Sequence, residues 1–332
     1  MKVIVGWSGG KDSQACLIWA KEKFGADKVE AAFCNTKWEK DVTYRHVELV
    51  PQMLGIKLTI LQSKNYDGFS DLVIKKGRMP STTARFCTEE LKTKPMIDYI
   101  LSQKESVLVI QGQRSDESAK RAKLDEQCRY FKYYFEPYQT NSMIVELLSL
   151  KKAITPKQLL KLNKAKQRLF EGKEDPKYHT YRKKEVFEWC KKYADDTWRP
   201  IFTWDAQKTI SYSLDHGIPL NPLYYLGFSR IGCYPCIMCT KKETKWIVDN
   251  DPERIDEIGD LEMESSAFFS ADEVPAKYRR QTSSTGKKYC SIYDVVDYIT
   301  DRHATGDLFA EIEKEEKLSS GRRCMSAYSI CE

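Results

Sequence analysis

The sequence contains no apolar run long enough to cross a membrane, and its first residues do not form a secretory signal. We therefore expect a soluble, cytoplasmic protein without a membrane partner. The chain also lacks internal repeats and low-complexity segments, which excludes solenoid and repetitive architectures. Its 332 residues, 41% of them hydrophobic, suffice for one large domain or two modest ones.

Histidine is also rare, and the net charge is small. Net charge is +6, from 54 basic and 48 acidic residues, which suits an anionic ligand but does not by itself indicate nucleic acid. Much of the excess lies in residues 150–192, where a solvated helical face is one interpretation and a groove for RNA, DNA or a carrier protein is the other. Four histidines show no spacing typical of a metal site or a triad and are assigned structural roles: His46, His179, His216 and His303.

Cysteine, by contrast, is abundant, with eleven residues. Because the number is odd and no export signal is present, metal ligation or redox chemistry explains them better than a disulfide framework. Cys233, Cys236 and Cys239 are each separated by two residues, so their thiols can converge on one metal centre. Such a run with a remote fourth cysteine favours a 4Fe-4S cluster. A zinc site, which usually uses two separated Cys-x-x-Cys knuckles, and unligated thiols are the alternatives.

The fourth ligand of such a cluster is an open question. Cys87 is our first choice because Arg85, Lys92 and Lys94 flank it, a setting that favours a ligand or a reactive thiolate over a buried apolar cysteine. The alternatives are Cys128, Cys324 and Cys331.

A glycine-rich turn, Ser-Gly-Gly-Lys-Asp-Ser at residues 8–13, lies between an apolar strand pattern at 3–7 and a helical pattern at 13–24. It has neither the Gly-x-x-x-x-Gly-Lys-Ser/Thr spacing of common NTPases nor Gly-x-Gly-x-x-Gly. A strand that passes through glycines into a helix presents backbone N–H groups and the positive end of the helix dipole to an anion. The residues predicted to bind a nucleotide phosphate or pyrophosphate are Ser8, Gly9, Gly10, Lys11, Asp12 and Ser13.

Strand and helix patterns alternate over the first 140 residues. Strands are predicted at 3–7, 29–35, 57–61 and 106–111, and helices at 13–24, 39–54 and 89–103. This alternation predicts an α/β fold with a doubly wound parallel sheet, in which ligands bind at the carboxyl ends of the strands. Asn35, Thr36 and Gly112 follow two of these strands and are expected at the same edge as residues 8–13.

A charged segment, Gly-Gln-Arg-Ser-Asp-Glu-Ser at residues 112–118, follows the fourth predicted strand. Arg114 and Arg121 have the fork geometry that binds phosphate or sulfate, with Glu117 as their structural partner. An exposed, charged helix start is the alternative.

The organisation predicted for the chain has four parts. They are a nucleotide-binding α/β core at 1–140, a basic helical insertion at 141–195, a completion of the core with the cysteine motif at 196–245, and a mainly helical C-terminal region at 246–332. The last part has a turn at 283–286 and ends in a cysteine-containing tail.

Several motifs, in their order along the chain, resemble the phosphoadenosine phosphosulfate (PAPS) reductase family of the PP-loop adenine nucleotide alpha hydrolase superfamily. Besides residues 8–13, they are Cys-Thr-x-x-Leu-Lys-x-x-Pro at 87–95, Pro-Ile-x-x-Trp at 200–204, Asn-Pro-Leu-Tyr at 221–224 and Gly-Cys-x-x-Cys at 232–236. The resemblance covers roughly residues 1–120 and 195–245. It is specific for the superfamily and not for one reaction.

Two departures from the family pattern bear on the reaction. The loop at 8–13 is complete, which resembles ATP-using branches such as ATP sulfurylase small subunits, thiolation enzymes and the DNA phosphorothioation protein DndC. PAPS reductases usually carry a degraded loop; in an ATP-using enzyme Asp12 would help to position Mg²⁺ on the pyrophosphate. The tail lacks the Cys-Gly motif of the reductases, and Cys324, beside Arg322 and Arg323, is a candidate thiolate, cluster ligand or packed anchor.

The resemblance therefore implies an ATP pyrophosphatase that works in sulfur chemistry. Lys11, Arg114 and Mg²⁺ would stabilise charge while an acceptor oxygen attacks the α-phosphate, and a thiolate or a sulfide held at the cluster would then displace AMP. A sulfur donor protein is a possible partner.

Two alternatives stay open. In a PAPS or adenosine phosphosulfate (APS) reductase, Cys324 would attack the sulfate sulfur and a thioredoxin-like protein would complete the reduction. A non-catalytic nucleotide-binding component of a nucleic-acid modification complex would instead bind DNA or RNA through residues 150–192. The oligomeric state is left open.

Overall fold

The computed structural model describes residues 1–305 except 83, 152, 270–272 and 283–287. The chain divides into two compact units, one combining residues 1–127 with the chain from 197 onward and the other holding residues 128–196. Cys324, Cys331 and the predicted turn at 283–286 lie outside the described residues. No described helix is both long and apolar enough to cross a membrane.

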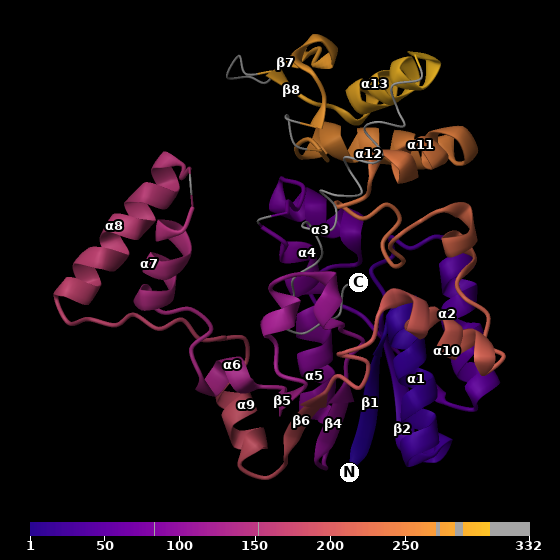
Figure 1. Cartoon of the computed structure of the whole chain (residues 1–332), viewed down its shortest axis with the longest axis vertical. Helices are drawn as coiled ribbons and strands as arrows, with labels where there is room; N and C mark the ends of the chain where they lie inside the picture. Colours follow the sequence, from indigo (N-terminus) through magenta and orange to yellow (C-terminus); the bar gives the residue numbers. More distant parts are fainter. Residues whose placement is uncertain (83, 152, 270–272, 283–287, 306–332) are drawn as a thin grey trace. The chain divides into compact units, whose positions relative to one another are not determined.

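A six-stranded sheet in the order β3-β2-β1-β4-β6-β5 organises the α/β core (Figure 1). Its strands are β1 (Lys2–Trp7), β2 (Val29–Cys34), β3 (Lys57–Leu61), β4 (Val107–Ile110), β5 (Gln127–Arg129) and β6 (Asp195–Trp198). β1 runs parallel to both of its neighbours, with Val5 in register with Ala31 of β2 and Ile110 of β4. The chain builds β2 and β3 on one side of β1 and then crosses to β4 on the other, which creates a switch point between β1 and β4. The predicted fold class is confirmed.

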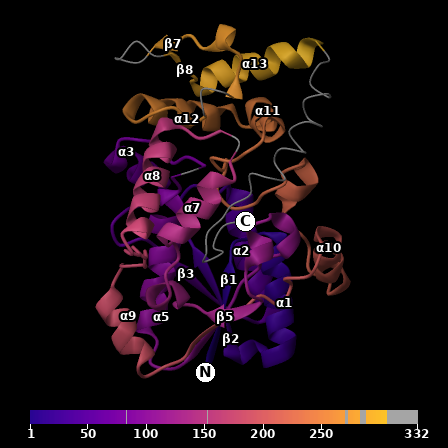
Figure 2. The same cartoon turned by 60° about the vertical axis from the view of Figure 1, so that its left-hand side comes forward.

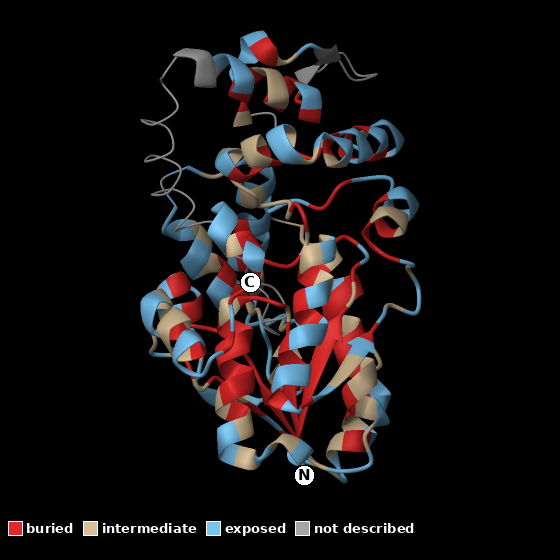
Figure 3. Ribbon diagram, turned by 90° about the vertical axis from the view of Figure 1, so that its right-hand side faces the viewer, coloured by how far each residue is buried: buried red, intermediate tan, exposed pale blue. Residues whose placement is uncertain are grey.

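The central strands are mostly apolar, with Glu30 of β2 as a buried exception, because helices cover both faces of the sheet. Every residue of β2 and β4 is buried. Helices α1 (Lys11–Phe24) and α2 (Asp41–Leu54) contribute Leu17 and Val50 to the core on one face, and α5 (Lys94–Ser102) packs against β2 and β3. Figure 3 shows these buried strands between helices whose outer surfaces are exposed.

A second apolar core lies in the same unit. It gathers the helices α3 (Phe69–Lys76), α11 (Lys241–Asn250), α12 (Pro252–Glu264) and α13 (Ile292–Thr305). Trp38, from the segment after β2, and Tyr234, from the cysteine motif, are buried in this core. The cysteine motif is therefore packed against the end of β2 although about 200 residues separate them in the sequence.

The shorter elements of the first unit connect these layers. They are α4 (Phe86–Thr88), a π-helical turn (Glu89–Thr93), α10 (Ala206–Asp215), the antiparallel pair β7 (Gln281–Thr282) and β8 (Lys288–Tyr289), and 3-10 helices at Ala26–Lys28, Ser115–Glu117, Arg121–Lys123, Pro222–Leu226 and Ala276–Tyr278.

The second unit is mainly helical. It holds α6 (Lys132–Phe135), α7 (Asn141–Ser149), α8 (Pro156–Phe170) and α9 (Lys183–Cys190). α7 and α8 lie side by side in both views (Figures 1 and 2) and form a helical hairpin. Their starts are encoded locally: Thr140 accepts from the Met143 amide, and Thr155 and Gln158 form a capping box.

The structure differs from the sequence-based expectations mainly in short elements. β5 and β6 were not predicted, because three or four residues are too few to show a periodic pattern. The helix predicted at 89–103 begins with the π-helical turn and is α-helical only from Lys94.

Candidate nucleotide site and thiol pocket

The turn at residues 8–10 connects the end of β1 to the start of α1. Gly9 has a φ of +82°, and a Cβ there would lie 3.1 Å from Val47 Cγ2 and 3.2 Å from Thr43 Cγ2 of α2. The turn is closed by Ser13, whose Oγ lies 3.0 Å from Ser8 Oγ and donates to the Gly10 carbonyl at 3.0 Å. Glycine is thus required both by the left-handed backbone and by the close approach of α2.

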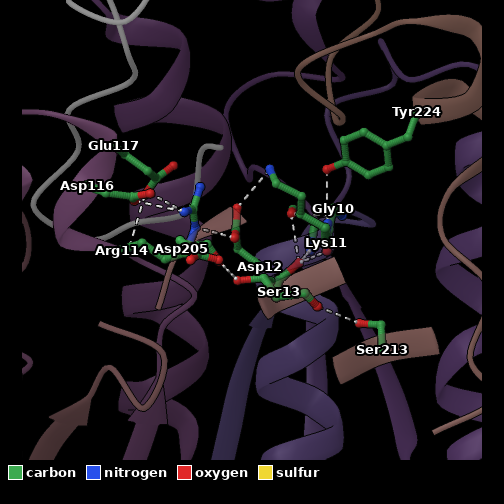
Figure 4. Close-up of polar contacts among 12 residues, drawn as sticks. Gly10, Lys11, Asp12, Ser13, Arg114, Asp116, Glu117, Asp205, Ser213 and Tyr224 are labelled. Atoms are coloured by element: carbon green, nitrogen blue, oxygen red, sulfur yellow. Dashed lines mark hydrogen bonds and ion pairs between the residues drawn. The ribbon is translucent and has the colours of Figure 1, made fainter. Parts of the chain in front are cut away.

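Asp12 is the electrostatic centre of this loop. Its carboxylate is 0% exposed, accepts from Arg114 Nε at 2.6 Å and pairs with Lys11 Nζ at 3.2 Å. Arg114, itself 3% exposed, also donates from Nη1 to both carboxylate oxygens of Asp116. Figure 4 shows the Lys11 and Arg114 side chains directed at the Asp12 carboxylate. Two cations are therefore held beside the loop by one buried anion.

Gly112 brings β4 close enough for this arrangement. A Cβ on Gly112 would lie 2.8 Å from the Asp12 carbonyl carbon and 2.8 Å from the Ser13 nitrogen, which are backbone atoms that cannot move aside. The glycine at the end of β4 therefore lets the Arg114 segment pack directly on the first turn of α1. This contact joins the two sides of the switch point.

Arg121 has a different environment from Arg114. Its guanidinium donates to Glu117, which also accepts from the Arg114 backbone amide at 3.1 Å. Arg121 is only 2% exposed. The structure places Glu117 as the partner of both arginines, because its Oε2 accepts from the Arg121 guanidinium and from the Arg114 backbone amide.

Tyr224 reaches the loop from a remote part of the chain. Its hydroxyl accepts a hydrogen bond from the Lys11 amide at 3.0 Å, and Lys11 Nζ lies 5.4 Å from the ring centroid (Figure 4). Asn221, fully buried three residues earlier, donates to Thr43 Oγ1 at 3.3 Å. The Asn-Pro-Leu-Tyr motif was noticed in the sequence, but nothing in its spacing indicated that Tyr224 would contact residue 11.

His46 contacts residues on both sides of the loop, Trp7 before it and Gln14 after it. Its Nε2 lies 2.9 Å from Gln14 Oε1, and its ring packs against Trp7. Burial lowers the pKa of His46 to about 4, so the imidazole is neutral near pH 7. Its role is structural, as predicted from the lack of any metal or triad spacing.

Asn35 and Thr36 follow β2 and lie in a buried hydrogen-bond network. Glu39, 4% exposed, accepts from Thr36 Oγ1 at 2.6 Å and from the Tyr44 hydroxyl at 2.8 Å. The same hydroxyl lies 3.1 Å from Asn35 Oδ1. Burial and the Glu39 carboxylate raise the pKa of Tyr44, so its hydroxyl stays protonated and donates. Glu39 and Tyr44 were not foreseen as site residues.

Three of the predicted cluster cysteines line one pocket. Cys87 reaches it from α4, and Cys233 and Cys236 reach it from the cysteine motif. The other residues that line it are Thr36, Phe69, Arg85, Thr88, Leu91, Lys92, Arg230, Ile231, Pro235 and Ile237. Segments from three distant parts of the chain, including three cationic side chains, therefore meet around these thiols.

Cys239, the fourth predicted ligand, lies one turn further along the motif. Its amide donates to the Cys236 carbonyl at 2.8 Å, and its Sγ lies 3.6 Å from Thr244 Oγ1. Cys128, an alternative ligand, belongs to the second unit. Among the residues that the structure describes, no three His, Cys, Asp or Glu side chains are arranged to hold a metal ion.

Comparison with known proteins identifies one family model. The phosphoadenosine phosphosulfate reductase domain matches residues 2–239, which include both the loop and the cysteine motif. An uncharacterised 37.8 kDa protein of Escherichia phage 186 is 30% identical over 225 residues, covering 64% of this chain and 50% of the relative. An adenosine 5'-phosphosulfate reductase of Rhizobium tropici is 35% identical over 60 residues, covering 17% of this chain and 33% of the relative.

Among solved structures, a PAPS reductase of Candida auris in complex with phosphate matches 71% of this chain and 83% of its own, with 14% identity and a TM-score of 0.41. The chain spans half or less of the length of three curated relatives that it matches, at 50%, 36% and 33%.

Proposed function

We propose that this chain, which belongs to the phosphoadenosine phosphosulfate reductase domain family, is an ATP pyrophosphatase that adenylylates an acceptor for sulfur transfer. The observation that carries the proposal is the pair of cations, Lys11 and Arg114, held by the buried Asp12 beside the glycine turn. Both lie at the switch point between β1 and β4, where doubly wound sheets bind their ligands.

In the proposed reaction ATP lies across the strand ends with adenine near Asn35 and Thr36. The Gly9 and Gly10 backbone and the Ser8 and Ser13 hydroxyls surround the phosphates. An acceptor oxygen attacks the α-phosphorus in line; the bond to the α–β bridging oxygen breaks, and its electron pair leaves with pyrophosphate. Lys11 and Arg114 stabilise the charge that develops on the leaving oxygens. The adenylylated acceptor then loses AMP to a sulfur nucleophile from a donor.

Asp12 is already paired with two cations in this arrangement. Both of its oxygens are engaged, one by Arg114 at 2.6 Å and the other by Lys11 at 3.2 Å, and the carboxylate is fully buried. Its part in the proposal is to orient the two cations. Magnesium would reach the site with the nucleotide phosphates.

The thiol pocket has the donor type of an iron–sulfur cluster, although its described thiols would have to move closer together to bind one. Cys87, Cys233 and Cys236 would ligate it, with Cys239 completing the set, while the cations in the pocket wall would balance the charge of thiolates and sulfides. Zinc is the alternative that thiolates also favour. A bound cluster would supply iron at which sulfur can bind.

Metal content tests this assignment directly. The protein, purified without oxygen, should contain iron and absorb in the visible region. Cys87→Ser should lose the iron, whereas Cys16→Ser, a buried cysteine of α1 outside the pocket, should retain it. Zinc in place of iron, or full iron content in Cys87→Ser, would overturn the ligand set.

The function itself is tested by offering two nucleotides in parallel. Pyrophosphate released from ATP, without sulfite from PAPS, supports the proposal. Sulfite from PAPS with ATP left intact assigns the reductase instead. Tight ATP binding without any turnover would favour a non-catalytic nucleotide-binding module.

The reductase is our second candidate because the family model and the Rhizobium tropici relative carry that name. In it the substrate would be PAPS or APS, and a tail cysteine would attack the sulfate sulfur, displacing the nucleotide. Cys324, the residue predicted for this step, lies outside the described residues. A thioredoxin-like protein would then release sulfite.

For the second unit we propose a nucleic-acid partner. α8 contains five basic and no acidic residues. Lys157, Lys161, Lys164 and Arg168 follow one another at intervals of four, three and four residues, which places them on one face of the helix. Four phosphate contacts predict a fall in affinity of about 100-fold between about 50 and 200 mM salt. The test measures the affinity for a labelled DNA or RNA 20-mer. An affinity that does not change with salt concentration, or that is the same in Lys164→Glu, would contradict the proposal.

A further inference from the structure

Glu39 lies where two functional regions of the first unit meet. Its carboxylate is buried and accepts three hydrogen bonds: from Thr36 Oγ1 at 2.6 Å, from the Tyr44 hydroxyl at 2.8 Å and from the Trp38 amide at 3.3 Å. A carboxylate is suited to this because both of its oxygens accept. A buried acceptor with this many donors fixes the orientation of each group that it holds.

One arm of this network leads to the nucleotide edge. The Tyr44 hydroxyl lies within hydrogen-bond distance of Glu39 Oε2 and of Asn35 Oδ1, at 2.8 and 3.1 Å. It has a single proton, so the two acceptors share it. A ligand that hydrogen-bonds to the Asn35 carboxamide therefore changes how strongly Tyr44 donates to Glu39.

The other arm leads to the thiol pocket. Thr36 Oγ1, which donates to Glu39, also lies 3.7 Å from Cys233 Sγ, and Thr36 lines the pocket. The backbone of Glu39 pairs with that of Cys233 in an antiparallel bridge. The Tyr234 amide donates to the Trp38 carbonyl at 2.6 Å, so the two segments form one structural piece.

We propose that Glu39 is a positioning residue that couples nucleotide binding at Asn35 to the position of the Cys233 sulfur in the thiol pocket, which alkylation reports in metal-free protein. The proposal rests on the proposed function only in placing a nucleotide at Asn35. Occupation of Asn35 redistributes the Tyr44 proton toward Glu39; Glu39 then holds Thr36 less tightly, and the Thr36 hydroxyl changes its contact with the Cys233 sulfur. No bond is made or broken in this step.

The test measures the alkylation of Cys233 by iodoacetamide in metal-free protein, quantified by mass spectrometry with and without saturating nucleotide. The coupling should change the rate at least about fivefold, the lower end of typical coupling between sites. The titration is run with both ATP and PAPS, and binding of each is measured by calorimetry. A nucleotide that binds without altering the rate overturns this inference alone; PAPS coupling without ATP binding overturns only the proposed ATP chemistry. Binding of neither overturns both.

Two variants locate the coupling. Thr36 and Tyr44 donate to different oxygens of Glu39, Oε1 and Oε2. In Glu39→Gln an NH2 donor replaces one of these oxygens, so one of the two hydrogen bonds is lost, and the nucleotide effect on Cys233 should be lost with it. Tyr44→Phe keeps the ring that packs against Phe33 and removes the shared proton. It should lose the nucleotide effect, and in nucleotide-free protein the Cys233 rate should shift in the direction opposite to that caused by nucleotide, because Glu39 then holds Thr36 more tightly.

Glu48→Gln is the matched control, because Glu48 is an exposed carboxylate on the same helix as Tyr44. It should keep the full nucleotide effect. If Glu39→Gln does not fold, the result for Tyr44→Phe alone tests whether the network carries the nucleotide effect. A full nucleotide effect in Tyr44→Phe would overturn the role of the network even where Glu39→Gln is uninformative.

Discussion

The loop at residues 8–13 and the thiol pocket are both at the end of the sheet where β1 and β2 terminate, but they are built in different ways. The loop takes its glycines, serines, Lys11 and Asp12 from six consecutive residues and adds Arg114 from β4's end. The pocket takes its thiols from residues 87, 233 and 236 and places Thr36 among them. The loop is a local structure with one long-range contact, and the pocket exists only when three distant segments have folded together.

This difference predicts how each region responds to change. In the loop a fully buried carboxylate holds two cations, so removing the carboxylate should affect stability, whereas removing Lys11 should affect the chemistry. In the pocket the three thiols are only partly buried, so changes there should affect ligand content more than stability.

The largest expected effect is on turnover. Lys11→Ala should lower pyrophosphate release by about 10³-fold, because the lysine stabilises charge on the leaving phosphates. Circular dichroism should show an unchanged fold. Lys28→Ala, which removes an exposed lysine just before β2 at the opposite edge of the sheet, should have the wild-type rate. Normal turnover in Lys11→Ala would show that the loop takes no part in the reaction.

The next effect concerns the two carboxylates bound to Arg114. Asp12→Asn should lower the free energy of unfolding by about 3–5 kcal/mol, because it leaves Lys11 and Arg114 without their buried anion. Asp116→Asn removes the half-exposed partner and should cost less than about 1 kcal/mol. Denaturant titration of both variants gives the comparison. Equal losses would mean that burial of Asp12 does not set the strength of this site.

A pH effect on stability is expected at His46, behind the loop. Its pKa in the folded protein, about 4, is below the unfolded value of 6.5, so the unfolded chain binds the proton more readily between these values. The contribution is complete above pH 6.5 and should decline by about 3 kcal/mol as the pH falls to 4. Urea titrations at several pH values measure this decline. His46→Gln should flatten it, and an equally steep decline in that variant would assign it to other groups.

The smallest expected effect is a difference in stability between alanine substitutions at two glycines. Gly112→Ala places a Cβ 2.8 Å from backbone atoms of Asp12 and Ser13 and should cost about 1–3 kcal/mol, with weaker nucleotide binding. Gly6→Ala in β1 meets nothing nearer than the Ile110 carbonyl at 3.8 Å and should be neutral or slightly stabilising. Melting temperatures and calorimetric nucleotide titrations of the two variants measure this. Equal changes in melting temperature and nucleotide binding in the two variants would show that β4 does not pack tightly against α1.

The sequence predicted the parts of the site that depend on nearby residues. The glycine turn and its lysine could be identified because strand, turn and helix signals occur together, and Asn35, Thr36 and Gly112 could be placed because parallel strands end at one edge. The family resemblance, and with it the α/β fold, is confirmed.

Contacts between distant segments could not be predicted in the same way. Tyr224 meets the Lys11 amide across 213 residues, and Glu39, between Trp38 and Lys40, has the sequence setting of an ordinary surface residue although it is buried. Asp12 was expected to help position magnesium, which stays a prediction; its ion pairs with Arg114 and Lys11 appear only in the folded chain. These features arise from packing, which local periodicity does not encode.

The most direct test of the account is to identify the bond of ATP that the protein breaks. ATP labelled on the α-phosphate and ATP labelled on the γ-phosphate are incubated separately with oxygen-free protein, with water as a slow acceptor. The account predicts α-label in AMP and γ-label in pyrophosphate, with both products lost in Lys11→Ala. Label in ADP and inorganic phosphate, or intact ATP beside sulfite formed from PAPS, would contradict it.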